Sequence, residues 1–140
     1  MTDLVIDASI AIKWVIEEQG TREAISLRRH RLFAPDLLVA ECANVLWKKT
    51  RRNELTPEEA QLAAKLLQRA DVELAPMRGL LEPATELAIA MDHPAYHCTY
   101  LALAERLSCD LVTADAKLSA KPLPPGYKSK VIGLTTTALP

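Results

Sequence analysis

A short apolar run near the start of the chain, followed at once by polar side chains, constrains the fold more than any other stretch. Leu4-Val5-Ile6 carries no polar residue, and Asp7 and Ser9 follow it two positions apart. Continuous apolar runs are typical of strands buried inside a parallel sheet, which present functional side chains at their carboxyl ends. Asp7 is therefore a candidate functional carboxylate. The alternative for a single aspartate here is a cap for the next helix.

The same plan returns late in the chain. Leu111 and Val112 are followed by Thr113 and then by Asp115, so a second apolar run ends in a small polar residue and an aspartate. The carboxyl ends of parallel strands meet in one crevice at the edge of a sheet. We therefore expect Asp7 and Asp115 to lie close together.

Strand-like and helix-like segments alternate along the chain, which is typical of an α/β domain with a parallel sheet. The 140 residues have the length of one domain, residues 1–140. Further strands are expected at 32–34, 72–74 and 130–134. Helices are expected at 10–16 with Ser9 as a possible cap, from 21 onward, and at 37–52, 80–91 and 95–107.

A helical hairpin is expected at about 37–70. Thr56 has the character of an N-cap, Pro57 suits the first helical position, and Glu59 completes a capping box. The helix that begins there pairs naturally with the preceding one. Such an exposed hairpin is a candidate surface for a partner.

Composition and charge argue against a disordered chain and against a protein that binds nucleic acid or membranes through a high overall charge. The chain is 49% hydrophobic with 4% aromatic residues, which indicates a packed core of Leu, Ala, Val and Ile. Its net charge of −1 supplies no global field for nucleic acid or an anionic membrane. Contact with nucleic acid would need a local patch, for which the basic helix end at 48–52 is a candidate; a solvated helix end is the alternative.

The cysteines and the hydropathy pattern bear on location. Cys42, Cys98 and Cys109 are too few and too widely spaced for a disulfide framework, which favours a reducing compartment. We see neither a signal peptide nor about 18 consecutive apolar residues. The expectation is a soluble, cytoplasmic protein without a membrane partner.

Glu41 adds a third acid to the candidate site. It lies in a mostly apolar half-helix, where a lone carboxylate is costly unless it is paired or binds a metal; the alternative is that it faces water at the edge of the buried stripe. Asp7, Glu41 and Asp115 would repel one another without a cation. Mg²⁺ or Mn²⁺ suits oxygen ligands and can activate water for attack on phosphorus.

Several segments together resemble PIN-domain proteins, and within that family the VapC-type toxin ribonucleases of bacterial toxin-antitoxin systems. The segments that carry the resemblance are Val5-Ile6-Asp7-Ala8-Ser9, Pro35-Asp36-Leu37 through Glu41, Asn44, Leu46-Trp47-Lys48, Tyr100-Leu101-Ala102-Leu103-Ala104-Glu105 and Leu111-Val112-Thr113-Ala114-Asp115. The resemblance implies a three-layer α/β/α sandwich with a central parallel sheet and a metal-dependent endoribonuclease that hydrolyses RNA phosphodiester bonds. It also implies a homodimer that a cognate antitoxin neutralises.

The resemblance also implies a role for individual residues. Asp7 and Asp115 would ligate the metal, with Glu41 in the same acidic cluster. Ser9 and Thr113 would hold those ligands or contact a phosphate. Asn44, one helical turn after Glu41, would support them.

One position departs from the family pattern. Tyr96 is followed by His97 where the family usually has an aspartate of the acidic cluster. His97 would be a ligand that favours manganese or zinc over magnesium, a base or proton carrier for the attacking water, or the mark of a weakened nuclease. The alternative function is therefore an impaired PIN-like module that only binds antitoxin or RNA.

Overall fold

The computed structural model describes residues 2–135 and 139–140, and within them a five-stranded parallel sheet forms the centre of the molecule. The strands lie in the order β3-β2-β1-β4-β5, and each pairs in parallel with its neighbours. Their bounds are β1 Asp3–Ile6, β2 Arg31–Pro35, β3 Glu73–Ala75, β4 Asp110–Thr113 and β5 Val131–Gly133. The expected α/β fold with a central parallel sheet is confirmed.

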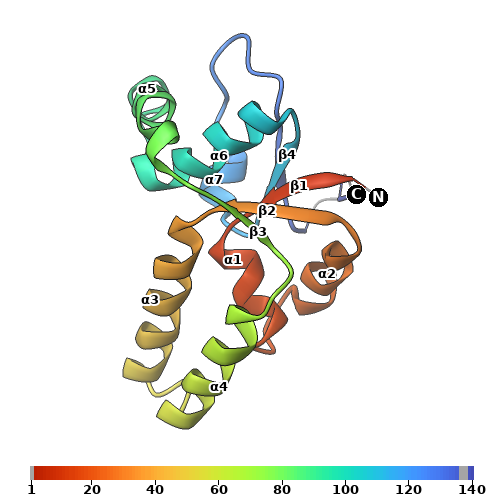
Figure 1. The fold of residues 1–140 in the computed structure, drawn as a ribbon, viewed down its shortest axis with the longest axis vertical. Helices are drawn as coiled ribbons and strands as arrows, with labels where there is room; N and C mark the ends of the chain where they lie inside the picture. The colour runs from red at the N-terminus through yellow and green to blue at the C-terminus, as the bar shows by residue number, and fades with distance from the viewer. Residues whose placement is uncertain (1, 136–138) are drawn as a thin grey trace.

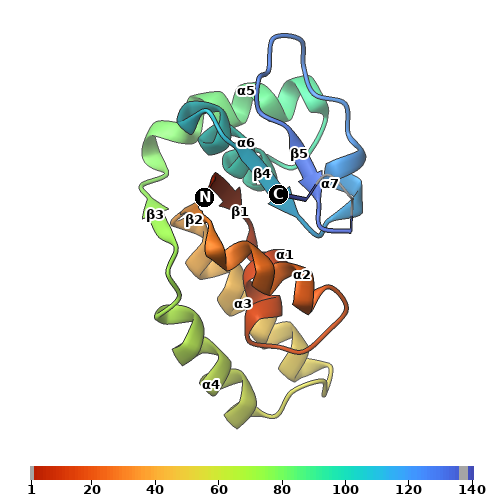
Figure 2. The same cartoon turned by 90° about the vertical axis from the view of Figure 1, so that its right-hand side faces the viewer.

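Helices cover both faces of this sheet and make three layers (Figures 1 and 2). One side carries α1 to α4, and the other carries α5, α6 and α7. The bounds are α1 Ala8–Ala11, α2 Thr21–Ser26, α3 Leu37–Arg51, α4 Pro57–Gln68, α5 Leu81–Met91, α6 Ala95–Leu107 and α7 Ala116–Ala120. Short 3-10 turns lie at η1 Ile12–Trp14, η2 Leu27–Arg29 and η3 Arg78–Leu80.

The two apolar runs of the sequence lie side by side in the middle of the sheet. Val5 of β1 is paired with Phe33 of β2 on one side and with Leu111 of β4 on the other. Val5 and Leu111 are fully buried, as strands covered by helices on both faces require. This pairing brings the carboxyl ends of β1 and β4 together.

The first helix differs from the one expected at 10–16. α1 begins at Ala8, so Ser9 lies inside the helix rather than capping it, and the chain continues from Ile12 as a 3-10 turn. Asp7 occupies the N-cap position without a capping hydrogen bond from its side chain. The physical reason is that the Asp7 carboxylate is held by other groups, as described below.

The capping box that starts α4 is present. The Thr56 hydroxyl accepts a hydrogen bond from the Glu59 backbone N–H at 3.1 Å, and the Thr56 N–H donates to the Glu59 carboxylate at 2.9 Å. α3 and α4 pack against each other and extend away from the sheet (Figure 1).

Among the described residues, no helix combines the length and apolar character needed to cross a bilayer.

Candidate active site

The residues singled out from the sequence meet at one cavity of about 310 Å³, here called the acidic cavity. Asp7 follows β1, Asp115 follows β4, Glu41 and Asn44 lie on α3, and His97 lies on α6. The lining consists of Asp7, Ala8, Ser9, Glu41, Asn44, Val45, Lys48, Tyr96, His97 and Asp115. Thr113 does not line it, because its side chain is fully buried next to Asp7.

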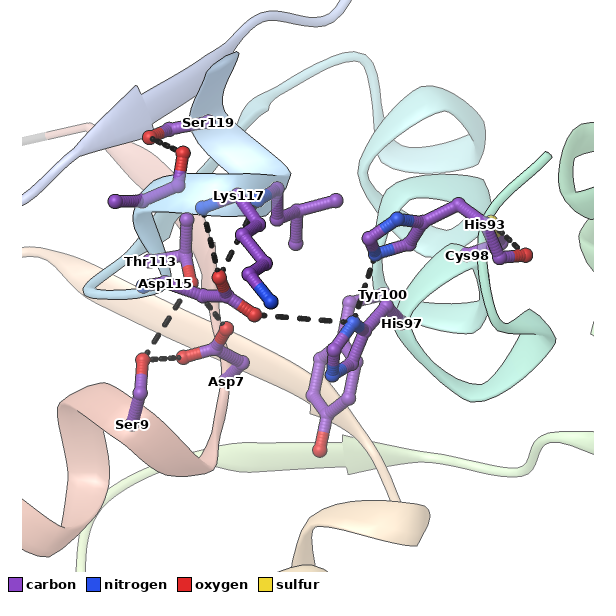
Figure 3. A network of polar contacts seen from close by, with 12 residues as sticks. Asp7, Ser9, His93, His97, Cys98, Tyr100, Thr113, Asp115, Lys117 and Ser119 are labelled. Carbon is purple, nitrogen blue, oxygen red and sulfur yellow. Dashed lines mark hydrogen bonds and ion pairs between the residues drawn. The ribbon is translucent and has the colours of Figure 1, made fainter. Parts of the chain in front are cut away.

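Two hydroxyl groups hold the carboxylate of Asp7. Ser9 Oγ donates to Asp7 Oδ1 and Thr113 Oγ1 donates to Asp7 Oδ2, each at 2.5 Å. The same hydroxyl oxygens accept hydrogen bonds from the backbone N–H groups of Ala114 at 2.9 Å and Asp115 at 3.0 Å. The loop after β4 is thereby joined to the end of β1 (Figure 3).

Burial dominates the electrostatics of Asp7. The side chain is 7% exposed, and desolvation raises the pKa of its carboxyl group although the hydrogen bonds from Ser9 and Thr113 and the charge of His97 act in the opposite direction. A buried carboxylate is costly without a counter-charge. Asp7 is therefore a group that a bound cation would stabilise.

Glu41 is bound from across the sheet. Its Oε1 accepts a hydrogen bond from the hydroxyl of Tyr100 on α6, and the residue is partly buried rather than fully exposed. Burial raises the pKa of the Glu41 carboxyl; the Tyr100 bond lowers it, and the negative charge of Asp7 raises it further. The role of Tyr100 was missed in the sequence, although a tyrosine on a buried stripe needs a partner for its hydroxyl.

The two carboxylate oxygens of Asp115 have different neighbours: Oδ1 caps a helix, and Oδ2 faces His97. Oδ1 accepts hydrogen bonds from the N–H groups of Lys117 at 2.9 Å and Leu118 at 3.3 Å, which caps α7. Oδ2 lies 3.9 Å from Nδ1 of His97. The helix-capping role considered for Asp7 thus belongs to Asp115.

His97 is part of a histidine pair. Its Nδ1 lies 2.9 Å from Nε2 of His93, which precedes α6, and its ring meets Tyr96 edge-on with 4.4 Å between centroids. Burial lowers the pKa of His93, and the charges of His97 and Lys121 lower it further. The sequence offered one signal for this pair, the spacing of four residues across the start of a helix.

The type of donor atom around the acidic cavity suits a hard divalent cation. Three carboxylates and the Asn44 amide bring oxygen atoms to one cavity, and oxygen is the donor that Mg²⁺ and Mn²⁺ prefer. In the part of the chain that the structure describes, Asp7 and Glu41 form no ion pair with Lys or Arg. As these side chains stand, no three His, Cys, Asp or Glu residues among 2–135 and 139–140 converge closely enough to hold one ion.

The acids that follow β1 and β4 lie at the carboxyl ends of parallel strands, the edge at which α/β sheets bind their ligands. The PIN domain family model matches residues 4–122, and the chain belongs to the PIN-domain family. Among curated relatives, Ribonuclease VapC9 of Mycobacterium tuberculosis is 34% identical over 83% of this chain and 88% of its own length. Ribonuclease VapC3 of Pyrobaculum aerophilum is 34% identical over 84% of this chain and 93% of its own.

Solved structures show the same fold at lower identity. PAE2754 from Pyrobaculum aerophilum gives a TM-score of 0.70 at 22% identity, covering 94% of this chain and 90% of that one. VapC20 from Mycobacterium tuberculosis, described as a Sarcin-Ricin loop cleaving toxin, gives 0.63 at 16% identity, covering 84% and 93%. VapBC2 from Rickettsia felis, bound to a DNA fragment from its promoter, gives 0.65 at 12% identity, covering 92% and 98%.

Proposed function

We propose that this protein is an endoribonuclease toxin that hydrolyses RNA phosphodiester bonds with Mg²⁺ or Mn²⁺ and is neutralised by a cognate antitoxin. One observation carries the proposal: the buried, hydroxyl-bound Asp7 shares a cavity with Glu41 and Asp115 in a member of the PIN-domain family. The curated relatives that cover most of the chain are ribonucleases, which supports the same reaction class.

The acidic residues would hold the metal, and their neighbours would fix them. Asp7, Asp115 and Glu41 are the proposed ligands, and Asn44 would support them from α3. A divalent ion held by these residues would supply a water of lowered pKa for attack on phosphorus and would stabilise the charge of the leaving oxygen. Ser9 and Thr113 orient Asp7 through their hydrogen bonds, and Tyr100 orients Glu41.

Two further side chains at the acidic cavity suit an RNA strand. Lys48 lies one turn beyond Asn44 on α3, is exposed, and supplies a positive charge for a phosphate. Tyr96 is 51% exposed, and an aromatic ring at the rim provides a stacking surface for a base. Both residues therefore support RNA binding beside the proposed metal ligands.

His97 carries the second candidate function. It places an imidazole where an additional carboxylate would strengthen binding of magnesium, and its Nδ1 is already in contact with His93. The alternative is therefore an impaired PIN-like module that binds antitoxin or RNA without cutting. Otherwise His97 is a ligand that favours manganese or zinc, or a proton carrier for the attacking water.

A nuclease assay with both metals separates these functions. Purified protein is incubated with RNA and either Mg²⁺ or Mn²⁺, beside the Asp7→Ala and His97→Asp variants. We expect metal-dependent cleavage by the wild type that Asp7→Ala loses, and stronger cleavage with Mg²⁺ in His97→Asp. If the wild type cleaves RNA no faster than Asp7→Ala, the proposed ribonuclease function is wrong. Activity that appears only in His97→Asp favours the binding module.

We also propose a homodimer and an antitoxin as protein partners. Leu62 and Leu66 of α4 are 59% and 51% exposed and border a cavity together with Val15 and Ile16, which suits an apolar partner segment. Trp47 on α3 is 53% exposed, with the Arg51 guanidinium 5.3 Å from its ring centroid.

The three cysteines are free thiols, which agrees with a cytoplasmic location.

Copurification and mass determination test these partners. Expressed together with the product of the neighbouring gene, the chain is expected to copurify with a small protein, and light scattering should give the mass of a dimer. Stable, non-toxic expression of the chain by itself argues against a need for an antitoxin.

A further inference from the structure

A second cavity adjoins the acidic cavity and has a different charge. It has a volume of about 620 Å³, and its polar lining consists of His93, His97, Lys117 and Lys121 together with Asp115. We call it the basic cavity. His97 and Asp115 line both spaces, so the two cavities meet at these side chains.

We propose that the basic cavity is a subsite for a phosphate of the RNA strand, next to the phosphate that is cleaved in the acidic cavity. The proposal rests on the proposed ribonuclease function and names where the strand continues beyond the site of cleavage. Two lysine ammonium groups and one N–H of the histidine pair offer hydrogen-bond donors to a phosphate without a metal ion.

Lys117 supplies a positive charge at the junction of the two cavities. Its backbone N–H is fixed by Asp115 Oδ1 at 2.9 Å, and its side chain extends beside Asp115 toward His97 (Figure 3). Within residues 2–135 and 139–140, its ammonium forms no ion pair with a carboxylate. The charge of Lys117 is therefore available to an incoming anion.

Lys121 is held in place before any ligand arrives. Its Nζ donates to the backbone carbonyls of Met91 at 3.0 Å and Asp92 at 2.9 Å, at the end of α5. An ammonium group has three donors, so one remains for a phosphate oxygen. Because these bonds fix the side chain, a phosphate that contacts Lys121 does not have to order a free lysine.

The remaining walls also suit a nucleotide. The hydrogen bond between His93 and His97 uses one nitrogen of each ring, and of the two remaining nitrogens of the neutral rings one carries an N–H for a phosphate oxygen. Pro94, Ala120 and Pro122 complete the lining with apolar surface, against which a sugar can pack. The basic cavity therefore combines N–H donors with an apolar wall.

The contrast between the cavities predicts different metal requirements. A phosphate that approaches Asp7, Glu41 and Asp115 meets negative charge and needs a cation between them. A phosphate in the basic cavity meets two lysines and the histidine pair, with Asp115 as the single carboxylate of the lining. Binding of the strand through this subsite should therefore persist when divalent metal is removed.

The test measures RNA binding by fluorescence anisotropy in EDTA over a range of NaCl concentrations. The probe is a short fluorescein-labelled single-stranded RNA, and the variants are Lys117→Met and Lys117→Arg. The matched control is Lys65→Met, an exposed lysine on α4 away from both cavities. Lys117→Met should weaken binding equally across sequences and reduce the slope of log K against log salt by about 0.7, because one phosphate contact is lost. Lys117→Arg and Lys65→Met should keep the wild-type slope.

A second pair of probes separates a strand phosphate from nonspecific attraction. Dinucleotides with and without one terminal phosphate are compared, with the phosphate placed at the 5′ end or the 3′ end. In the wild type, one of the two placements should tighten binding, and Lys117→Met and Lys121→Met should lose that gain. The proposal is overturned if both variants match Lys65→Met in slope and in the response to the terminal phosphate.

Cleavage kinetics distinguish failure of the subsite from failure of the proposed function. Lys117→Met should raise KM for RNA and leave kcat close to the wild-type value, since Lys117 contacts a phosphate that does not react. If Lys117→Met cleaves RNA with an unchanged KM, the subsite proposal is wrong and the nuclease proposal is unaffected. If the wild type does not cleave RNA but its RNA binding still depends on Lys117, the nuclease proposal is wrong and the subsite proposal is unaffected.

Discussion

At the scale of single residues, Thr113 connects the two halves of the candidate site. Its hydroxyl donates to Asp7 and accepts from the backbone N–H of Asp115, so one buried oxygen positions both aspartates. A buried polar group that loses its partner costs about 1–3 kcal/mol. Thr113 should therefore matter for stability as well as for activity.

Thr113→Val keeps the shape of the side chain and removes both hydrogen bonds. We expect it to lower metal-dependent RNA cleavage about 10- to 100-fold, as is typical when a residue that orients a metal ligand is lost. Urea denaturation should show a loss of about 1–3 kcal/mol in the free energy of unfolding. Thr85→Val is the control, since Thr85 is exposed and its hydroxyl bonds only within α5. Equal activity in the two variants would contradict the positioning role.

At the scale of secondary-structure elements, the start of α4 is defined by local interactions. The hydrogen bonds between Thr56 and Glu59 satisfy backbone groups that the first turn leaves free. The start of α1 is different, because Ser9 lies inside the helix, donates to Asp7 and accepts a hydrogen bond from the backbone N–H of Ala114. The contact with Ala114, 105 positions away, is tertiary, and the local capping preference of a serine does not predict it.

Thr56→Ala should destabilise the fold by about 1 kcal/mol, because it removes an N-cap and half of a capping box. Chemical denaturation measures this loss, and helicity by circular dichroism checks that α4 persists. The control is Thr85→Ala, because Thr85 is exposed to solvent in the middle of α5 and does not cap a helix. A capping role for Thr56 is wrong if both variants unfold at the same denaturant concentration.

At the scale of the whole molecule, the buried acids make stability depend on pH and on metal. Burial raises the pKa of Asp7 and Glu41 in the folded state, above their ordinary values of 3.8 and 4.5. Protons therefore bind these groups more tightly in the folded protein than in the unfolded chain. Their contribution to stability is present at low pH and is lost as the pH rises through the raised pKa values.

Asp7→Asn should remove part of this dependence. In metal-free buffer, the free energy of unfolding of the wild type relative to Asp7→Asn should fall as the pH rises from about 4 toward neutrality, since only the wild type acquires the buried charge. Added Mg²⁺ should stabilise the wild type by about 2.7 kcal/mol at a hundredfold excess over Kd and leave the variant little changed. Asp71→Asn, an exposed substitution away from the cavity, should follow the wild type. A constant difference between wild type and Asp7→Asn across this range would contradict the buried charge.

The sequence by itself determined the sheet and two of its acids. The apolar runs before Asp7 and Asp115 specify central strands, and the alternation of strands and helices specifies a parallel sheet, because these patterns are local and periodic. The position of Glu41 in a mostly apolar half-helix added a third acid, and the resemblance to PIN-domain proteins gave Asn44 its supporting role; the structure has both residues at the same cavity as Asp7.

Only the tertiary structure decided how these side chains are held and what lies beside them. The bond of Tyr100 to Glu41 joins residues 59 positions apart, and the bond of Thr113 to Asp7 joins residues 106 apart, so no local pattern predicts them. The capping role of Asp115, the pairing of His93 with His97 and the adjoining basic cavity likewise depend on how α6 and α7 pack on the sheet. Hydrogen bonds and charges of this kind are set by packing across elements, whereas the strands themselves are set by the order of apolar residues.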